Sequence, residues 1–386
     1  MIKKTLKALY SSYKYKNEKR YFDNIIDYID FDEAKQEILK SINTITFVIP
    51  GMYSFSGGHT SILRLGSHLA NFGYNINYVS YKNQNVEDME KSAEINLANF
   101  KGRFFSKDQL FDLSSDVYVA TMWDSSYVVK KLPGYKMYFV QDYEPYFYPY
   151  GEKHILAKKS YELGLHIVTL GPWIKEKIKS EIQSLTKIDA IDFPYEKSEY
   201  GIVERNFNDY KHKKEFDIAV YIKRTEKRAP FIIQNMLEKV SNKLKEDKNI
   251  TLNVSYFGED KRVKLMSGKN LGKLNKTQLY ELYKKSDFGM VASLTNISLV
   301  PYEMMATCLP IIEFEEGTFK HFFKSDCAIL TSFNWKVLYQ HLIEVIDNPE
   351  LLKIKVNNGL NELKDLSWEN TAKQFSEIIK SLSRAQ

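Results

Sequence analysis

Short apolar runs alternate with helix-like segments along most of this chain, in two series. The first series consists of the runs at 44–50, 75–81, 117–122, 136–142, 165–170 and 188–194. The second consists of the runs at 216–222, 251–258, 288–293, 309–315 and 327–332. Such runs, separated by helices, are typical of strands buried on both faces of a parallel sheet. The sequence therefore predicts an α/β fold class with two units in succession.

The length of the chain agrees with two units, because 386 residues are long for a single hydrophobic core. Polarity rises over 198–215, which is the best candidate for a linker. The predicted parts are a basic N-terminal extension, two Rossmann-like domains and a C-terminal amphipathic helix. Their boundaries are 1–40, 41–200, 214–365 and 366–386.

The net charge of +6 is concentrated at the N-terminus. Residues 1–20 hold seven basic residues and one acid, Glu18, which leaves 48 basic and 48 acidic residues in the rest of the chain. A balanced remainder argues against a nucleic-acid-binding protein. Leu6, Leu9, Tyr10 and Tyr13 have helical spacing, and a basic amphipathic helix can lie on an anionic membrane surface. A solvated or loosely packed leading helix fits the same pattern.

Cysteine and histidine usage narrows the cellular setting. Cys308 and Cys327 are the two cysteines, which implies no disulfide framework and fits a reducing cytoplasm. No apolar run approaches the roughly 20 residues of a membrane span, and the histidines have no zinc-like spacing. We expect a cytoplasmic protein, soluble or peripheral on the inner face of the cell membrane, with no metal and no cofactor.

The first candidate motif is Ser56-Gly57-Gly58-His59, between the first predicted strand and the first helix. Glycines at a helix N-terminus let a ligand approach backbone N–H groups closely. The motif is not GxGxxG, and no acid ends the second strand to hold a ribose. This disfavours a dinucleotide-binding oxidoreductase, and a plain tight turn remains an alternative.

The second motif is the polar cluster Gln141, Asp142 and Glu144, which ends the run at 136–142 and continues into YFYPYG. Carboxylates and aromatic faces are what carbohydrate recognition requires, because the first accept hydroxyls and the second cover C–H faces. A carboxylate here could also act as a general base. A surface loop with solvated acids is the alternative interpretation.

The third motif is a group of four cations, Lys223, Arg224, Lys227 and Arg228, directly after the first strand of the second series. A departing pyrophosphate requires cationic donors, which Arg and Lys supply in different geometries. A solvated charged loop explains the same residues without a ligand.

The fourth motif is TNISLVPYEMMATCLPIIEFE, at 295–315. Pro301 suits the first position of a helix, which predicts Glu303 in the first turn, near free backbone N–H groups. A capping box for Glu303 is excluded, because Val300 stands where Ser or Thr is required.

The order of the four motifs resembles GT-B glycosyltransferases, and the runs at 123–151 and 272–315 resemble the family 4-like, rhamnosyltransferase type. The resemblance implies two Rossmann-like domains facing across a cleft, the first for the acceptor and the second for a nucleotide sugar. In this family a second glutamate binds ribose, and Glu303 matches it. The first glutamate falls on Thr295, so the chain departs from the pattern there.

The resemblance implies roles for fifteen residues. The catalytic ones are Lys223, Arg224 and Asp142. The donor-binding ones are Gly57, Gly58, Arg228, Thr295, Asn296, Ser298, Leu299, Val300 and Glu303. The acceptor-binding ones are His59, Gln141 and Glu144.

The implied activity is metal-independent, retaining transfer of a sugar from a nucleoside-diphosphate sugar to a glycan or lipid-linked glycan acceptor. The resemblance implies dTDP-rhamnose as donor and capsule or O-antigen as product. A non-catalytic GT-B-like subunit that binds a partner or a membrane is the alternative, and Thr295 is its main support.

Overall fold

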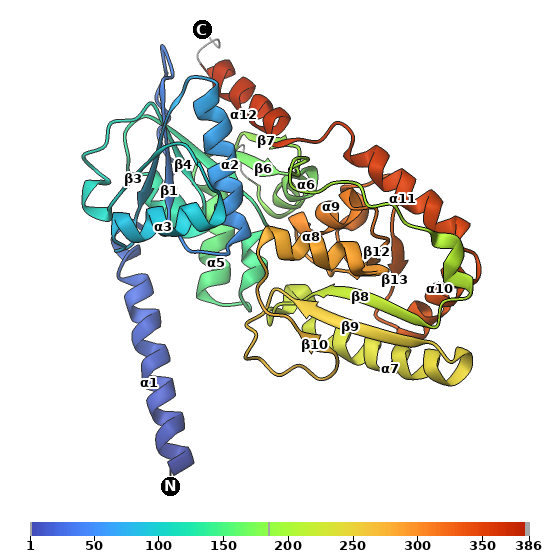
Figure 1. The fold of residues 1–386 in the computed structure, drawn as a ribbon. Coiled ribbons are helices and arrows are strands. Elements are labelled where there is room, and N and C mark those ends of the chain that lie inside the picture. The colour runs from blue at the N-terminus through green and yellow to red at the C-terminus, as the bar shows by residue number, and fades with distance from the viewer. Residues whose placement is uncertain (1, 184–185, 383–386) are drawn as a thin grey trace. The chain divides into compact units, whose positions relative to one another are not determined.

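The chain forms two compact units in the computed structural model, which describes residues 2–183 and 186–382. Unit 1 comprises the described residues of 1–170, 174–191 and 372–386, and unit 2 comprises 171–173 and 192–371. Each unit contains one twisted parallel sheet with helices packed on it (Figure 1). The two predicted α/β units are therefore present.

The sheet of unit 1 has seven parallel strands in the order β3-β2-β1-β4-β5-β6-β7. Their bounds are β1 (Thr44–Ile49), β2 (Asn75–Ser80), β3 (Arg103–Phe105), β4 (Val117–Ala120), β5 (Tyr135–Val140), β6 (His166–Leu170) and β7 (Ile188–Ile191). All six predicted strands are confirmed. The sequence missed β3, a three-residue edge strand whose Arg103 is exposed, because so short a strand shows no apolar run.

The helices of unit 1 include α2, whose predicted apolar face is buried at Ile62, Leu65 and Leu69. The Ser56 side chain caps its first turn, and Gly73 follows its end with a φ of +98°, the left-handed conformation that favours glycine. The helix bounds are α1 (Ile2–Phe22), α2 (Gly57–Asn71), α3 (Val86–Asn96), α4 (Trp123–Val129), α5 (Glu152–Lys159), α6 (Pro172–Glu181) and α12 (Trp368–Leu382).

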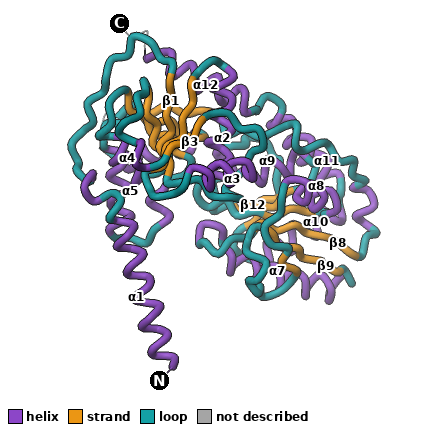
Figure 2. The backbone as a smooth tube through the Cα atoms, turned by 60° about the vertical axis from the view of Figure 1, so that its left-hand side comes forward, coloured by secondary structure: helices purple, strands orange, loops and turns teal. Residues whose placement is uncertain are grey.

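Helix α1 extends away from the sheet of unit 1 as a single rod (Figure 2). Exposed side chains along it include Leu9, Tyr10, Tyr13 and Tyr15. Its last turn is attached to the unit, because the Tyr21 hydroxyl donates a hydrogen bond to Asp124 Oδ2 at 2.7 Å. Within residues 2–183 and 186–382, no helix has the length and apolarity that crossing a membrane requires.

The sheet of unit 2 has six parallel strands in the order β10-β9-β8-β11-β12-β13. Their bounds are β8 (Glu215–Tyr221), β9 (Thr251–Phe257), β10 (Lys269–Asn270), β11 (Phe288–Met290), β12 (Ile311–Phe314) and β13 (Ile329–Thr331). The five predicted strands are confirmed, and the two-residue edge strand β10 was missed. The helices are α7 (Pro230–Lys248), α8 (Lys276–Lys285), α9 (Leu299–Ala306), α10 (Trp335–Asp347) and α11 (Glu350–Leu363).

Two helix starts of unit 2 agree with the sequence. Helix α7 begins at Pro230, whose fixed φ and missing N–H suit the first position. Helix α8 is capped by Asn275, whose side chain accepts from the Gln278 N–H while Gln278 reaches back. Both helices thus begin at the residues that the sequence predicts.

The segment at 198–215, suggested as a linker by its polarity, packs on unit 2. Phe207 and Tyr210 lie in the hydrophobic core of that unit. The Arg205 guanidinium donates to the carbonyls of Tyr283 and Ser286, both at 2.6 Å. The boundary between the units lies earlier in the chain, between Ile191 and Asp192.

The predicted start of α9 at Pro301 is wrong. The helix begins at Leu299 with Ser298 as N-cap, so Pro301 is its third residue. Proline is tolerated there because the first turn has no intrahelical N–H partners to lose. Glu303 consequently lies in the second turn, and the first turn carries no acid.

Candidate functional site

The strand orders place a topological switch point in each sheet, between β1 and β4 in unit 1 and between β8 and β11 in unit 2. Ligands of open parallel sheets bind outside the carboxyl ends of the strands at such points. The predicted site residues follow β1 and β5 in unit 1, and β8 and β11 in unit 2.

In unit 1, the loop after β1 and the loop after β5 lie next to each other. Gly57 and Gly58 are the exposed first two residues of α2. A Cβ atom built on Gly58 would lie 3.6 Å from Gln141 Nε2, and one built on Gly57 would meet nothing within 4 Å. The backbone N–H groups of this helix start are thus open on one side and bordered by the Gln141 amide on the other.

The imidazole of His59 is turned into its own loop. His59 is buried, and its Nδ1 accepts from the Tyr53 N–H at 3.1 Å. Burial lowers the pKa of His59, so the ring is neutral at pH 7 and suited to accept this bond. His59 therefore shapes the loop at 51–58.

Glu144 is buried inside unit 1, where two donors hold its carboxyl group. The Trp123 N–H donates to Oε2 at 2.7 Å, and the Tyr138 hydroxyl donates to Oε1 at 2.8 Å. Burial raises the pKa of Glu144 to about 8. The nearby Asp142 is also buried, and its Oδ1 accepts from the Tyr143 N–H at 2.8 Å.

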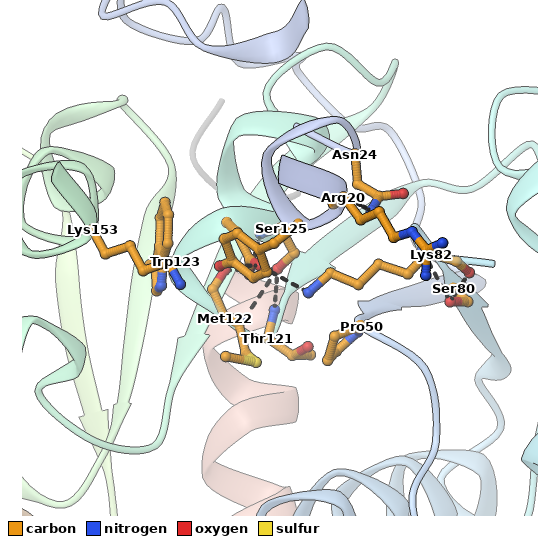
Figure 3. A network of polar contacts seen from close by, with 12 residues as sticks. Arg20, Asn24, Pro50, Ser80, Lys82, Thr121, Met122, Trp123, Ser125 and Lys153 are labelled. Carbon is orange, nitrogen blue, oxygen red and sulfur yellow. Dashed lines mark hydrogen bonds and ion pairs between the residues drawn. The ribbon is translucent and has the colours of Figure 1, made fainter. Parts of the chain in front are cut away.

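Asp124 forms a polar network that the sequence did not indicate (Figure 3). Its carboxylate is fully buried at the start of α4 and accepts from Tyr21 and, at 3.1 Å, from Lys82 Nζ. Figure 3 shows Lys82 among Arg20 of α1, Ser80 of β2, and Pro50 and Thr121, which follow β1 and β4. An acid two residues after a predicted strand end is the signal that could have pointed to it.

Exposed aromatic side chains follow the same strand ends of unit 1. Tyr53 and Phe55 precede α2, and Tyr146 and Tyr150 follow Glu144. Tyr150 is the most accessible of the four, with 85% of its surface exposed. Flat apolar faces beside polar groups are suited to the C–H faces of sugars.

In unit 2, two of the predicted cations are accessible at the carboxyl end of β8. The Arg224 side chain is 63% exposed, and its Nε lies 3.4 Å from Glu259 Oε2. Lys223 is half-buried, with its ammonium 5.8 Å from the centroid of the Tyr221 ring. Both side chains carry positive charge at the switch point.

Arg228 is buried and joins the two loops of the switch point. Its Nη1 donates to the carbonyl of Ala292 at 2.9 Å, and its guanidinium lies 5.7 Å from the Tyr221 ring centroid. Ala292 lies two residues after the end of β11. The loop with the cations and the loop that leads to α9 are therefore in contact.

The loop at 294–298 ends at the N-terminus of α9. Thr295 and Asn296 are buried, and Ser298 is the N-cap without a side-chain capping bond. Leu299 and Val300 are the first two helical residues, whose N–H groups have no partner within the helix. Such a start attracts anions through its N–H groups and its dipole.

Glu303 lies one turn further along α9 and is partly buried. The Tyr283 hydroxyl donates to its Oε2 at 3.2 Å, and Tyr283 itself is fully buried. Tyr283 therefore fixes the orientation of a carboxylate near the loop at 294–298. Among the residues that the structure describes, no group of three His, Cys, Asp or Glu side chains could hold a metal ion.

Glu313 is the second buried acid that sequence reasoning missed. It lies in β12, which was predicted only as a strand, and its carboxylate binds Ser293 beside the loop at 294–298. An acid inside an otherwise apolar strand was the available signal.

No family model matches the chain. One curated relative, the O-antigen biosynthesis protein RfbC of Myxococcus xanthus, is 29% identical over 146 residues. That match covers 36% of this chain and only 12% of the length of the relative.

Solved structures resemble the chain over most of its length. Sucrose-phosphate synthase from Thermosynechococcus elongatus has a TM-score of 0.67 at 12% identity, covering 89% of this chain and all of the other. HepE of Anabaena, in complex with UDP and glucose, has a TM-score of 0.64 at 10% identity, covering 88% of this chain and all of the other. Both are similar to this chain in fold, and the chain thus has the GT-B fold of two Rossmann-like units.

Proposed function

We propose that this protein is a glycosyltransferase that moves a sugar from a nucleoside-diphosphate sugar to a glycan acceptor in bacterial surface polysaccharide synthesis. The observation that carries the proposal is the hydrogen bond from Arg228 to the Ala292 carbonyl in unit 2. It joins the loop with the exposed cations to the loop that ends at the N-terminus of α9. Cations and helix N–H groups together are what a diphosphate requires.

Unit 2 would bind the donor. The N–H groups of Leu299 and Val300 would bind phosphate oxygens, and Glu303, oriented by Tyr283, would accept hydrogen bonds from the ribose hydroxyls. The side chains of Thr295, Asn296 and Ser298 would supply polar contacts to the transferred sugar, in place of the glutamate that Thr295 replaces. Gly57 and Gly58 of unit 1 complete the predicted donor-binding set.

Lys223 and Arg224 would act when the sugar–phosphate bond breaks. Negative charge then develops on the departing diphosphate, and cations placed before the reaction stabilise that charge without reorganising. Arg228 would act indirectly, since its guanidinium is buried and holds the Ala292 carbonyl.

Unit 1 would bind the acceptor, with Gln141 and the exposed aromatic side chains contacting sugar rings. Asp142 would accept the proton of the attacking hydroxyl as a general base. His59 and Glu144, predicted as acceptor-binding residues, would contribute by shaping the loops at 51–58 and 141–148, because their polar atoms bind protein groups.

The finer details of the proposed reaction follow from the resemblance and from the similar proteins. The resemblance supports a retaining, metal-independent reaction that uses no cofactor, with dTDP-rhamnose as donor. The name of RfbC supports an O-antigen product, and capsule is the other product class. HepE was solved with UDP and glucose, so uridine donors belong in the same screen.

The basic helix α1 supports a place at the inner face of the cell membrane. Its exposed tyrosines and Leu9 could enter the headgroup region while its lysines contact anionic lipids. A lipid-linked glycan would then be the acceptor class.

The alternative function is a non-catalytic GT-B-like subunit that binds a partner or a membrane. The observation that favours it is Thr295 at the place of the first family glutamate. Hydrolysis or transfer of a nucleotide sugar by the purified protein would exclude this alternative.

A thermal-shift screen against UDP-, GDP- and dTDP-sugars tests the proposed function. A donor that binds only the native state raises the melting temperature in a concentration-dependent way. The Glu303→Ala variant serves as the matched control, and it should lose the shift. Absence of a shift with every nucleotide sugar, at millimolar concentration, would contradict the proposed function.

A further inference from the structure

Glu313 is a fully buried acid in the middle of an apolar strand. It occupies the third position of β12, between Ile312 and Phe314, and none of its surface is exposed. Burying a carboxyl group costs free energy unless hydrogen bonds compensate, whereas an apolar side chain at this position would carry no such cost. The groups that bind Glu313 therefore indicate what it does.

Both carboxylate oxygens of Glu313 bind one residue, Ser293. The Ser293 N–H donates to Oε2 at 3.1 Å, and the Ser293 hydroxyl donates to Oε1 at 2.6 Å. Ser293 is itself fully buried and follows β11, the strand next to β12. Glu313 of β12 thus holds both the backbone and the side chain of Ser293, where the chain leaves β11.

Other groups fix the same short stretch. The Thr318 N–H donates to the Ser293 carbonyl at 2.7 Å, and Arg228 binds the carbonyl of Ala292. Gly317 leaves room for this arrangement, because a Cβ atom there would lie 2.5 Å from the Ser293 carbonyl oxygen. The direction in which the chain departs from β11 is therefore set by the side chains of Glu313 and Arg228 and by the backbone N–H of Thr318.

The charge around Glu313 agrees with a carboxylate that serves as an anchor. Burial raises its pKa to about 7, while the Ser293 bonds and the positive charge of Arg228 favour the ionised form. Arg228 therefore supports Ala292 directly and Glu313 electrostatically.

We propose that Glu313 is a positioning residue of the donor site, which holds Ser293 and thereby sets the path of residues 294–298 into α9. The connection to the donor rests on the proposed function, since those residues are assigned to the nucleotide sugar there. The positioning itself concerns only contacts within unit 2. The two parts can consequently be tested separately.

The first measurement is amide hydrogen exchange of the full chain without ligand, over residues 293–300. Glu313→Ala removes both bonds to Ser293, and exchange in this segment should become about tenfold faster or more. Glu313→Gln should stay near the wild-type rate, because an amide accepts from the Ser293 N–H and donates to its hydroxyl. Glu315→Gln, an exposed position just beyond the same strand, is the matched control and should change nothing.

The amides of β8, at 218–220, report whether a variant disturbs the whole sheet. Faster exchange at 293–300 with unchanged exchange at 218–220 supports the positioning role. Equal acceleration in both segments, or no change at 293–300, overturns it. If Glu313→Ala does not fold, Ser293→Ala removes the shorter of the two bonds and should show the same local effect at smaller size.

The second measurement is the affinity for UDP, GDP and dTDP by titration calorimetry. For the nucleotide that binds the wild type, Glu313→Ala should lower the affinity about tenfold, and Glu313→Gln should have an affinity near that of the wild type. In Glu313→Ala, turnover at saturating donor should change less than KM. Unchanged affinity alongside faster loop exchange would overturn the donor part of the proposal. If the wild type binds none of the three nucleotides, the proposed function fails, and the exchange data still decide the role of Glu313.

Discussion

The carboxyl edge of the sheet in unit 1 and the carboxyl edge in unit 2 expose different kinds of side chain. In unit 1, Asp124 and Glu144 are buried and bound to protein donors, and aromatic side chains are what the loops expose. In unit 2, the loop after β8 exposes Arg224, and α9 begins with N–H groups that have no partner within the helix. The edge of unit 1 is suited to the faces of neutral sugars, and that of unit 2 to a polyanion.

Under the proposed function, this difference is what lets two sheets of the same design take different ligands. Both sheets have a switch point at the corresponding position, so the sheets themselves do not select the ligand. The class of ligand is decided by the side chains that the loops leave accessible. A buried acid such as Glu144 contributes through the loops it holds, whereas an accessible cation can meet a substrate directly. Substitutions at the accessible and the buried groups test this contrast.

The largest effect is expected from the double substitution Lys223→Ala and Arg224→Ala. If unit 2 stabilises a departing diphosphate, turnover should fall about 10²- to 10³-fold, as when preorganised electrostatic partners are removed. Steady-state kinetics with the best donor of the screen measure this. Arg262→Ala, at a side chain that is 90% exposed, is the control and should retain full turnover. If the double variant turns over as fast as the wild type, the cations of unit 2 do not stabilise a departing polyanion.

The next effect concerns Glu303, the carboxylate that Tyr283 orients. Glu303→Ala should weaken donor binding about 10- to 100-fold, because a hydrogen-bonded charge at the ribose is lost. Titration calorimetry with the nucleotide measures the affinity, and circular dichroism should show an intact fold. Glu281→Ala, on the exposed face of α8, is the control. Normal affinity in Glu303→Ala would contradict the assignment to ribose.

A third experiment tests whether the buried carboxyl group of Glu144 has a structural role in unit 1. The pKa of Glu144 is raised to about 8, so the folded state holds a proton that the unfolded state has released above its ordinary value near 4.5. The stability that the protonated Glu144 gives to the folded state is complete at low pH, and it is lost as pH rises toward 8. Between pH 6 and 8, unfolding free energy should fall by about 2 kcal/mol through this group.

Urea unfolding at several pH values measures this dependence. Glu144→Gln should flatten it, because an amide does not titrate, while Glu152→Gln at an exposed position should leave it unchanged. If the stability of Glu144→Gln varies with pH as in the wild type, Glu144 is not the group that titrates in the interior of unit 1.

The smallest effect is expected at the membrane. Deletion of residues 1–16 removes most of the basic charge of α1 but keeps Tyr21 on Asp124 and the ion pair between Glu18 and Lys153. Recovery with phosphatidylglycerol vesicles should fall several-fold, because basic residues near an anionic surface are attracted to it. Neutral phosphatidylcholine vesicles should recover neither protein. Equal sedimentation of both proteins with anionic vesicles would argue against membrane contact through α1.

Most of the fold could be predicted from the sequence, because strands buried on both faces appear as continuous apolar runs. Edge strands such as β3 and β10 were missed, since their exposed residues show no such run. The start of α9 was misplaced, since Pro301 is compatible with several positions of a first turn and Ser298 supplies the N-cap. Local sequence thus predicts elements better than it predicts their first residues.

The candidate site was predictable where its residues follow a strand end, as Arg224 and Gln141 do. The hydrogen-bond partners of Asp124 and Glu313 were not predictable, because they come from other parts of the chain. Tyr21 lies 103 residues from Asp124, and Ser293 lies 20 residues from Glu313. A single sequence does not reveal which donor a buried carboxylate will meet after folding.

Helix α12, near the end of the chain, packs on unit 1, which is formed mainly by the first part of the chain. Phe375 packs against Phe139 of β5 with ring centroids 6.2 Å apart, and Ser376 Oγ lies 3.0 Å from the Tyr74 hydroxyl. During translation, unit 1 consequently stays incomplete until the ribosome has made almost the whole polypeptide, and unit 2 has the earlier opportunity to finish folding. A nascent chain stalled before residue 370 would expose the face that Phe375 covers, and it would be a target for chaperones.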